Sequence, residues 1–168
     1  LLLAFLGILP LKGQRFEQYI YLPDSFGGCL QAHYILWDSI DDRIYLFPWN
    51  GNSVTIDCRT DEKIGNPLLS DAGFSGATWN PVNNRIYAVY HDSMIRMSDE
   101  ACRIVVFDCA SSQVVGEIPF VAPNSSPPGQ YFIINSINNK IYLPMRDSIL
   151  IIDGQSNQII GGLRLEPF

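Results

Sequence analysis

The stretch DSIDDRIY at residues 38–45 is repeated, with conservative changes, as NPVNNRIY at 80–87 and NSINNKIY at 135–142. Each copy is followed by a second shared phrase, which reads VTIDCRTDEKIG at 54–65, VVFDCASSQVVG at 105–116 and LIIDGQSNQIIG at 150–161. In every second phrase a glycine follows an aspartate by eight positions: Asp57 and Gly65, Asp108 and Gly116, Asp153 and Gly161. Two phrases that keep register along the chain mark an internal repeat, and a repeat decides the architecture before any single residue does.

Each repeat is predicted to contain four short strands. A turn rich in Asp and Asn follows the first strand, because these residues tolerate a left-handed backbone and bond their own main chain. The second strand carries an Ile-Tyr pair, which places Tyr45, Tyr87 and Tyr142 in register. The third strand is nearly all apolar, as expected of a strand that is buried on both faces. No window has a helical period, so the chain is predicted to be all-β.

Four-stranded units in tandem, each too small to bury its own faces, are typical of the blades of a β-propeller. We expect three blades, at about 33–66, 76–119 and 130–165. Residues 14–22 (QRFEQYIYL) form a further predicted strand, which gives three times four strands plus one. Closed propellers typically have about four to eight blades. The ring is therefore expected to be incomplete, the chain to be the front part of a longer protein, and the remaining blades of that protein to be its partners.

The repeat also resembles a known family. Asn-Asn-Lys-Ile-Tyr at 138–142, an apolar run that ends in Ile-Asp at 152–153, and Ile-Ile-Gly at 159–161 are similar to the YVTN-type propeller repeat. The resemblance covers about residues 33–165 and implies a propeller of the kind found in bacterial and archaeal surface and periplasmic proteins. It implies little about function, since the motif consists of turn and core residues. The second copy departs from the pattern by an insertion, because Tyr87 and Asp108 are 21 positions apart against 12 and 11 in its neighbours.

The first thirteen residues, LLLAFLGILPLKG, are apolar until Pro10 and Lys12 interrupt them. This run is too short to span a bilayer and matches the apolar region of a secretory signal peptide, with cleavage at Gly13. A buried strand or short helix is the alternative. We expect an exported protein, in the periplasm, at the cell surface or outside the cell, with no membrane span in the mature chain.

Charge and cysteines limit the partners and the crosslinks. Without residues 1–13 the chain keeps 10 of its 11 basic side chains against 17 acidic ones, a net charge of −7, and no stretch clusters Lys or Arg. Such a surface repels a phosphate backbone, so nucleic acid is excluded as a partner. Cys58 and Cys109 occupy equivalent positions in neighbouring repeats, too far apart for a bridge. If a disulfide forms, Cys29–Cys102 is the pair against which the geometry argues least, but free thiols are favoured.

The repeated aspartates are assigned to structure. Asp57, Asp108 and Asp153 each precede a Ser/Thr-containing turn, where a short carboxylate bonds backbone amides. Asn84 and Asn139 are likewise expected to hold their turns. A residue that recurs in every repeat is expected to stabilise the fold of the repeat, so we predict neither a catalytic nor a metal-binding role for these five.

The connections between the units vary, and they are predicted to lie together on one face. Variable loops on a regular scaffold are the usual place for binding. The inserted loop at 91–102 and the equivalent corners of the other units supply these candidate binding residues: Trp49, Asn50, His91, Asp92, Arg96, Asp99, Glu100, Arg146 and Asp147.

No chemistry-bearing motif stands out. His33 and His91 lack neighbours at ligand spacing, so no metal site or other cofactor is predicted. Calcium at Asp92, Asp99 and Glu100 is kept as an alternative, although the spacing matches no known loop. Trp49 is suited to stack on a sugar or peptide, but also to cover an edge of its unit. No phosphate loop or nucleophile elbow appears.

The sequence therefore favours a non-enzymatic exported scaffold that binds a protein, a glycan or a cell-surface component through its variable loops. Two alternatives stay open. One is a propeller enzyme, a lactonase-like hydrolase or a quinone-dependent dehydrogenase, whose catalytic residues lie in other blades. The other is a structural protein of a surface layer.

Overall fold

The computed structural model describes residues 32–48, 52–65, 73–91, 102–121 and 131–165. The predicted signal segment at 1–13, the predicted strand at 14–22 and Cys29 lie outside these residues. The described residues form twelve strands and no helix, which confirms the all-β prediction.

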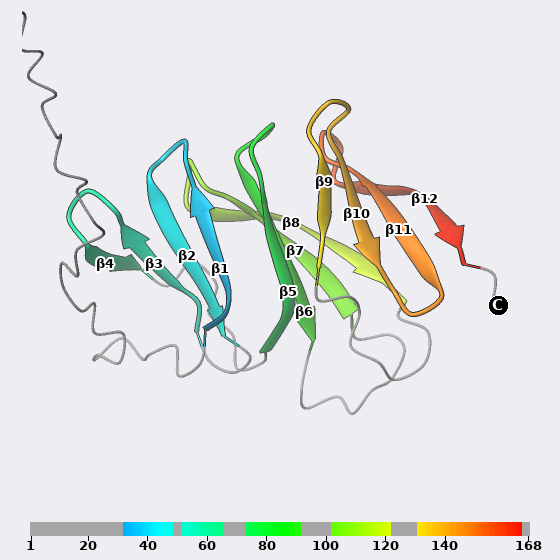
Figure 1. Cartoon of the computed structure of the whole chain (residues 1–168), viewed down its shortest axis with the longest axis horizontal. Helices are drawn as coiled ribbons and strands as arrows, with labels where there is room; N and C mark the ends of the chain where they lie inside the picture. Colours follow the sequence, from blue (N-terminus) through cyan, green and yellow to red (C-terminus); the bar gives the residue numbers. More distant parts are fainter. Residues whose placement is uncertain (1–31, 49–51, 66–72, 92–101, 122–130, 166–168) are drawn as a thin grey trace, which may run out of the picture.

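The strands form three four-stranded antiparallel sheets, each a simple meander in chain order (Figure 1). The first sheet contains β1 (Ala32–Asp38), β2 (Arg43–Pro48), β3 (Val54–Asp57) and β4 (Glu62–Gly65). The second contains β5 (Gly73–Asn80), β6 (Arg85–His91), β7 (Cys102–Asp108) and β8 (Gln113–Phe120). The third contains β9 (Ile133–Asn135), β10 (Lys140–Pro144), β11 (Ser148–Asp153) and β12 (Gln158–Arg164).

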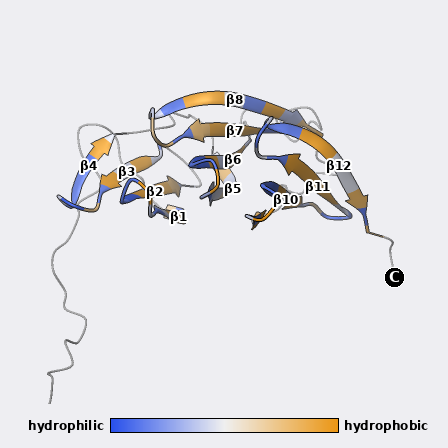
Figure 2. Ribbon diagram, turned by 90° about the horizontal axis from the view of Figure 1, so that it is seen from above, coloured by the Kyte–Doolittle hydropathy of each residue, from blue (hydrophilic) through white to orange (hydrophobic). Residues whose placement is uncertain are grey.

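The three sheets stand side by side and follow an arc (Figure 2). Their fourth strands, β4, β8 and β12, lie along the convex side of the arc, and β1 and β5 lie on the opposite side. The sheets therefore pack face against face, so that each interior sheet surface faces a neighbour rather than water.

The register of the strands sets which residues share a face. Tyr45 pairs with Thr55 and Tyr87 pairs with Val106, and the equivalent Tyr142 pairs with Ile151. We call the side of each sheet that carries this repeated tyrosine its forward face, and the other side its backward face. Because side chains alternate along a strand, the neighbouring residues Ile44, Ile86 and Ile141 belong to the backward faces.

Two hydrophobic cores hold the three sheets together, each made by a forward face and the next backward face. Tyr45 and Phe47 of the first sheet pack with Ile86, Ala88 and Phe107 of the second. In the other core, side chains from the forward face of the second sheet pack with those from the backward face of the third: Tyr87, Val89, Ile104, Val106, Ile118, Phe120, Ile141, Leu143 and Ile152. Tyr45 meets Phe107 edge to face, with ring centroids 5.8 Å apart, a favourable aromatic geometry.

The expectation that every third strand is buried on both faces is wrong for β11. The central residues of β3 and β7 are buried, whereas in β11 only Ile152 is buried and the other apolar residues are half-buried. The physical reason is that, among the described residues, only the backward face of the third sheet packs against another sheet, so that the forward-facing Ile149 and Ile151 are half-buried.

Candidate functional site

The array of sheets has two different ends. At the turn end, which is uppermost in Figure 1, each sheet has a turn between its first and second strands and another between its third and fourth. These six turns are 39–42, 58–61, 81–84, 109–112, 136–139 and 154–157. At the loop end the strands are joined through 49–53, 66–72, 92–101, 121–132 and 145–147.

The repeated aspartates of the turn end bond their own turns. Asp108 Oδ1 accepts hydrogen bonds from the amide and the hydroxyl of Ser111, both at 2.8 Å. Asp153 accepts the same pair from Ser156, and Asp57 accepts one from the Arg59 amide. The bonds from Ser111 lower the pKa of the Asp108 carboxyl below its ordinary value, because they stabilise its charged form. The Oδ1 atom of each aspartate is thus engaged by the turn that follows it, which agrees with the structural role predicted for these residues.

The turns between first and second strands are held by side-chain bonds to their own main chain, as the sequence predicted. The residue directly before each of these turns is Asp or Asn, and its side-chain oxygen accepts a hydrogen bond from the amide two residues later. The three bonds are Asp38 to Ile40 at 2.9 Å, Asn80 to Val82 at 3.0 Å and Asn135 to Ile137 at 3.0 Å. The repetition of Asp or Asn at 38, 80 and 135 is the sequence signal for these bonds.

The left-handed backbone expected of Asn84 and Asn139 is present, with φ of 52° and 51°. The turns between third and fourth strands share this feature at their last residue, namely Asp61, Ser112 and Asn157. A left-handed backbone was not predicted for these three residues. Ser112 is an uncommon choice for such a position, which shows that the geometry of the turn overrides the preference of the residue.

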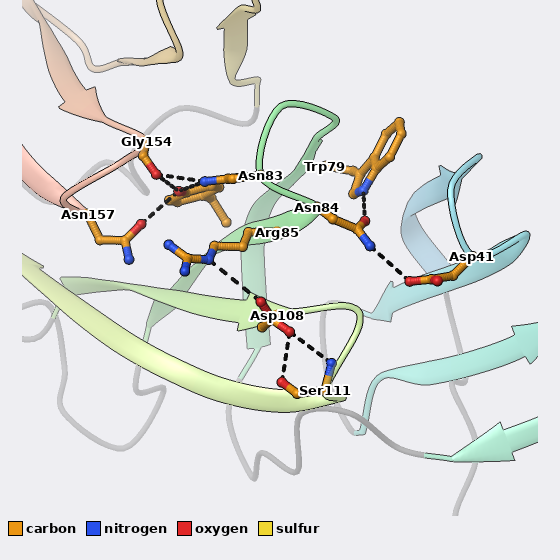
Figure 3. A network of polar contacts seen from close by, with 10 residues as sticks. Asp41, Trp79, Asn83, Asn84, Arg85, Asp108, Ser111, Gly154 and Asn157 are labelled. Carbon is orange, nitrogen blue, oxygen red and sulfur yellow. Dashed lines mark hydrogen bonds and ion pairs between the residues drawn. The ribbon is translucent and has the colours of Figure 1, made fainter.

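The first interface between sheets is bridged by polar contacts at the turn end. Arg43 Nη1 donates to the Cys109 carbonyl at 3.1 Å and lies 3.4 Å from Ser112 Oγ. Asn84 Nδ2 donates to Asp41 Oδ2 at 2.9 Å (Figure 3). Asn84 thus spans two sheets, since its Oδ1 also accepts a bond from Trp79 Nε1 at 2.9 Å.

The second interface repeats this arrangement with different side chains. The Tyr87 hydroxyl donates to Asn157 Oδ1 at 2.8 Å and accepts a bond from Asn83 Nδ2 at 3.0 Å. Asn83 Nδ2 also donates to the Gly154 carbonyl at 2.6 Å (Figure 3). Cys109 and Gly154 both follow the repeated aspartate directly, and Ser112 and Asn157 both stand four positions after it. Each sheet therefore reaches the same two turn positions of the next sheet.

Burial affects the two forward-facing tyrosines and one thiol. Burial raises the pKa of the Tyr45 and Tyr87 hydroxyls, so both stay protonated at any physiological pH. Burial also raises the pKa of the Cys109 thiol to about 12. Cys58 and Cys109 are free thiols, as favoured by the sequence. With such a pKa, Cys109 has almost no thiolate and is unsuited to act as a nucleophile.

At the loop end the structure describes two of the candidate binding residues completely. Arg146 and Asp147 lie in the short connection between β10 and β11, which is closed by a bond of 2.7 Å from the Met145 amide to the Ser148 carbonyl. The Asp147 carbonyl accepts a bond from the Leu165 amide, also at 2.7 Å. This corner is fixed by backbone contacts, so its side chains are presented from a rigid support.

The other candidates are not brought together by the described part of the chain. His91 is the last residue of β6 and pairs there with Gly73 and Cys102. The remaining candidates lie outside the described residues: Trp49, Asn50, Asp92, Arg96, Asp99 and Glu100. The predictions that these residues bind a partner, or calcium, stay predictions.

Among the residues that the structure describes, no group of three or more His, Cys, Asp or Glu side chains is placed to hold a metal ion. Within the same residues there is no helix long and apolar enough to cross a bilayer.

Comparison with known proteins gives a likeness of fold. No family model matches the chain, and no curated protein sequence matches it. Among solved structures, hydrazine synthase of Kuenenia stuttgartiensis superposes with a TM-score of 0.64 at 15% sequence identity. The match covers 90% of this chain and 40% of that one, so the chain spans about two fifths of the length of its structural neighbour. At this identity the likeness shows a shared fold alone.

Proposed function

We propose that the chain is part of an exported β-propeller that acts as a non-enzymatic binding scaffold, with the loop end as its binding surface. The observation that carries this proposal is the contrast between the two ends. All six turns of the turn end contain four residues, whereas the five connections at the loop end contain 5, 7, 10, 12 and 3. Regular turns support a fold, and variable connections on that support are where binding residues are usually found.

The propeller is supported by the way in which one interface repeats the other. Each forward face packs on the next backward face, and each sheet bonds the same two positions of the next turn. Repetition of one rotation about a common axis generates a ring, with first strands toward the axis and fourth strands at the rim. The arc seen in Figure 2 agrees with such a ring.

The rigid corner at Arg146 and Asp147 supports the loop end as the binding surface. A cation and an anion side by side suit a polar partner such as a peptide or a glycan, and Trp49 at the equivalent corner of the first unit would add a stacking surface. A protein, a glycan or a cell-surface component is therefore the proposed partner. The resemblance to the YVTN-type repeat supports an exported location for this interaction.

The test compares the two ends by mutation. One variant combines Trp49→Ala, Arg146→Ala and a scrambled 92–101 segment. The control carries Ile137→Ser at the turn end, where Ile137 is 96% exposed. Both are labelled and applied to a glycan array and to isolated bacterial cell envelopes. Binding should be lost in the first variant and kept in the control. If the first variant still binds and the control does not, the binding surface lies at the turn end and the proposal is wrong.

A further inference from the structure

We propose that the forward face of the third sheet is a docking surface for a further four-stranded sheet of the same repeat. The apolar residues of this face include Ile133, Tyr142, Pro144, Ile149, Ile151 and Leu163. The inference concerns a different surface from the loop end, and it does not depend on the proposed binding function.

The apolar positions of this face have buried counterparts in the second sheet. Alignment of the two repeats places Tyr142 on Tyr87, Ile151 on Val106 and Leu163 on Ile118. The counterparts on the second sheet are all buried in its core with the third sheet. Leu163, in contrast, is 54% exposed where Ile118 is 5% exposed. A surface with the composition of a sheet interior, but open to solvent, is typical of an interaction site.

This face also carries polar side chains equivalent to those that form hydrogen bonds at the two observed interfaces between sheets. At both observed interfaces, donors of one sheet reach the carbonyl that follows the repeated aspartate of the next sheet: Arg43 reaches Cys109, and Asn83 reaches Gly154. The third sheet carries Lys140 at the position of Arg43, and Asn138 at the position of Asn83. The Tyr142 hydroxyl forms no hydrogen bond within the described residues, although the equivalent hydroxyl of Tyr87 contacts Asn83, Gly154 and Asn157.

These donors define the partner that fits. The docking sheet must present a turn between its third and fourth strands with a free carbonyl after an aspartate, and a hydrogen-bond acceptor three residues beyond that carbonyl. It must also present an apolar backward face like that of Ile141, Leu143 and Ile152. Another copy of the repeat would supply both the turn with its two acceptors and the apolar backward face, at the required spacing.

A second copy of the chain is a poorer occupant. The equivalent backward face of the first sheet contains Leu46, Val54 and Ile56, which are already buried in a cluster of their own. That face would have to be uncovered before it could pack on another molecule. The docking surface is therefore assigned to an additional repeat unit rather than to self-association.

The experiment adds such a unit to the full chain. A duplicate of residues 122–165 is appended after residue 165, and a second version carries a duplicate of 66–121. Each is compared with the parent by amide exchange of β11 and β12 in the original third sheet, because the added unit brings an open forward face of its own and total dye binding would not change. Exchange of these two strands should slow in at least one extended protein. If neither extension shields this face, the proposal is wrong.

Tyr142→Phe tests the specific hydrogen bonds. In an extended protein the substitution should lower the folding equilibrium constant about fivefold, the effect of one buried hydrogen bond. In the parent chain it should leave the constant unchanged, because the hydroxyl is not engaged there. An equal effect in both proteins would contradict the proposal. So would a parent chain that sediments as a dimer and loses that dimer on Leu163→Lys, since the occupant would then be a second copy.

Discussion

Substitution of Tyr87 by Phe tests whether the polar contacts between sheets contribute to stability. Tyr87 is fully buried, and its hydroxyl bonds Asn157 at 2.8 Å and Asn83 at 3.0 Å. The Phe ring fills the same space, so packing is kept and the hydrogen bonds alone are lost. Asn83 retains its bond to the Gly154 carbonyl, whereas Asn157 Oδ1 loses its close donor.

The magnitude follows from these contacts. Loss of a buried hydrogen bond, with one acceptor left unsatisfied, costs about 1–2 kcal/mol. For a domain of about 150–250 residues each kcal/mol lowers the melting temperature by roughly 2–4 °C. We therefore expect the melting temperature of Tyr87→Phe to fall by about 2–8 °C.

Tyr45→Phe is the matched control. Tyr45 occupies the same position in the first sheet and is equally buried, but its hydroxyl lies beside Arg43 and Cys109 without a hydrogen bond of good geometry. Removal of an unsatisfied buried hydroxyl should change the free energy of unfolding by less than about 0.5 kcal/mol, or increase it.

Urea unfolding, followed by tryptophan fluorescence, measures both variants against the parent. The midpoint should fall for Tyr87→Phe and stay near the parent value for Tyr45→Phe, with equal slopes. Equal destabilisation by the two substitutions would refute the view that the hydrogen bonds of Tyr87 hold the second interface.

Three further outcomes are expected. Gly154→Ala should lower the melting temperature, because a Cβ there would lie 2.7 Å from Asn139 Cγ and 2.9 Å from its carbonyl oxygen; an unchanged thermal unfolding curve would contradict this. Asp108→Asn should be less stable than the parent at pH 7, where the parent carboxylate is charged and bonded by Ser111. Because the pKa of Asp108 is lowered on folding, its contribution is complete above the ordinary value of 3.8 and is lost as the pH falls through the lowered one. The difference between the two unfolding free energies should therefore shrink in acid, and a difference independent of pH would be the contrary result. Cys109, with a pKa of about 12, should resist iodoacetamide at pH 8 in the native protein and react after unfolding, as read by mass spectrometry of peptides; rapid labelling of the native protein would show that the first core is open.

Local features were accessible from the sequence because they depend on neighbours along the chain. The phrases at 38–45, 80–87 and 135–142 predicted a turn between two strands, and the structure has four-residue turns there with left-handed Asn84 and Asn139. The even spacing of the apolar runs predicted four strands per repeat, which the three meanders confirm. Asp and Asn form hydrogen bonds to backbone atoms within a few residues, so these turns depend only on the nearby sequence.

The candidate site could be predicted only in outline. Chain connectivity alone decides that the variable connections gather at one end, because antiparallel meanders alternate their turns between two ends. Which side chains of those connections meet is decided by contacts between residues far apart in sequence, and the described residues fix only the corner at Arg146 and Asp147.

What the sequence by itself determined is thus the repeat, its four strands and the turns that join them. Only the tertiary structure decided the roles of the equivalent tyrosines. Tyr45, Tyr87 and Tyr142 stand at equivalent positions of the repeated phrase, yet the Tyr45 hydroxyl is buried without a good partner, the Tyr87 hydroxyl bonds the next sheet, and Tyr142 is half-exposed. The physical reason is that burial and hydrogen bonding at a sheet face depend on the sheet that packs against it, and no local pattern encodes the presence of that neighbour.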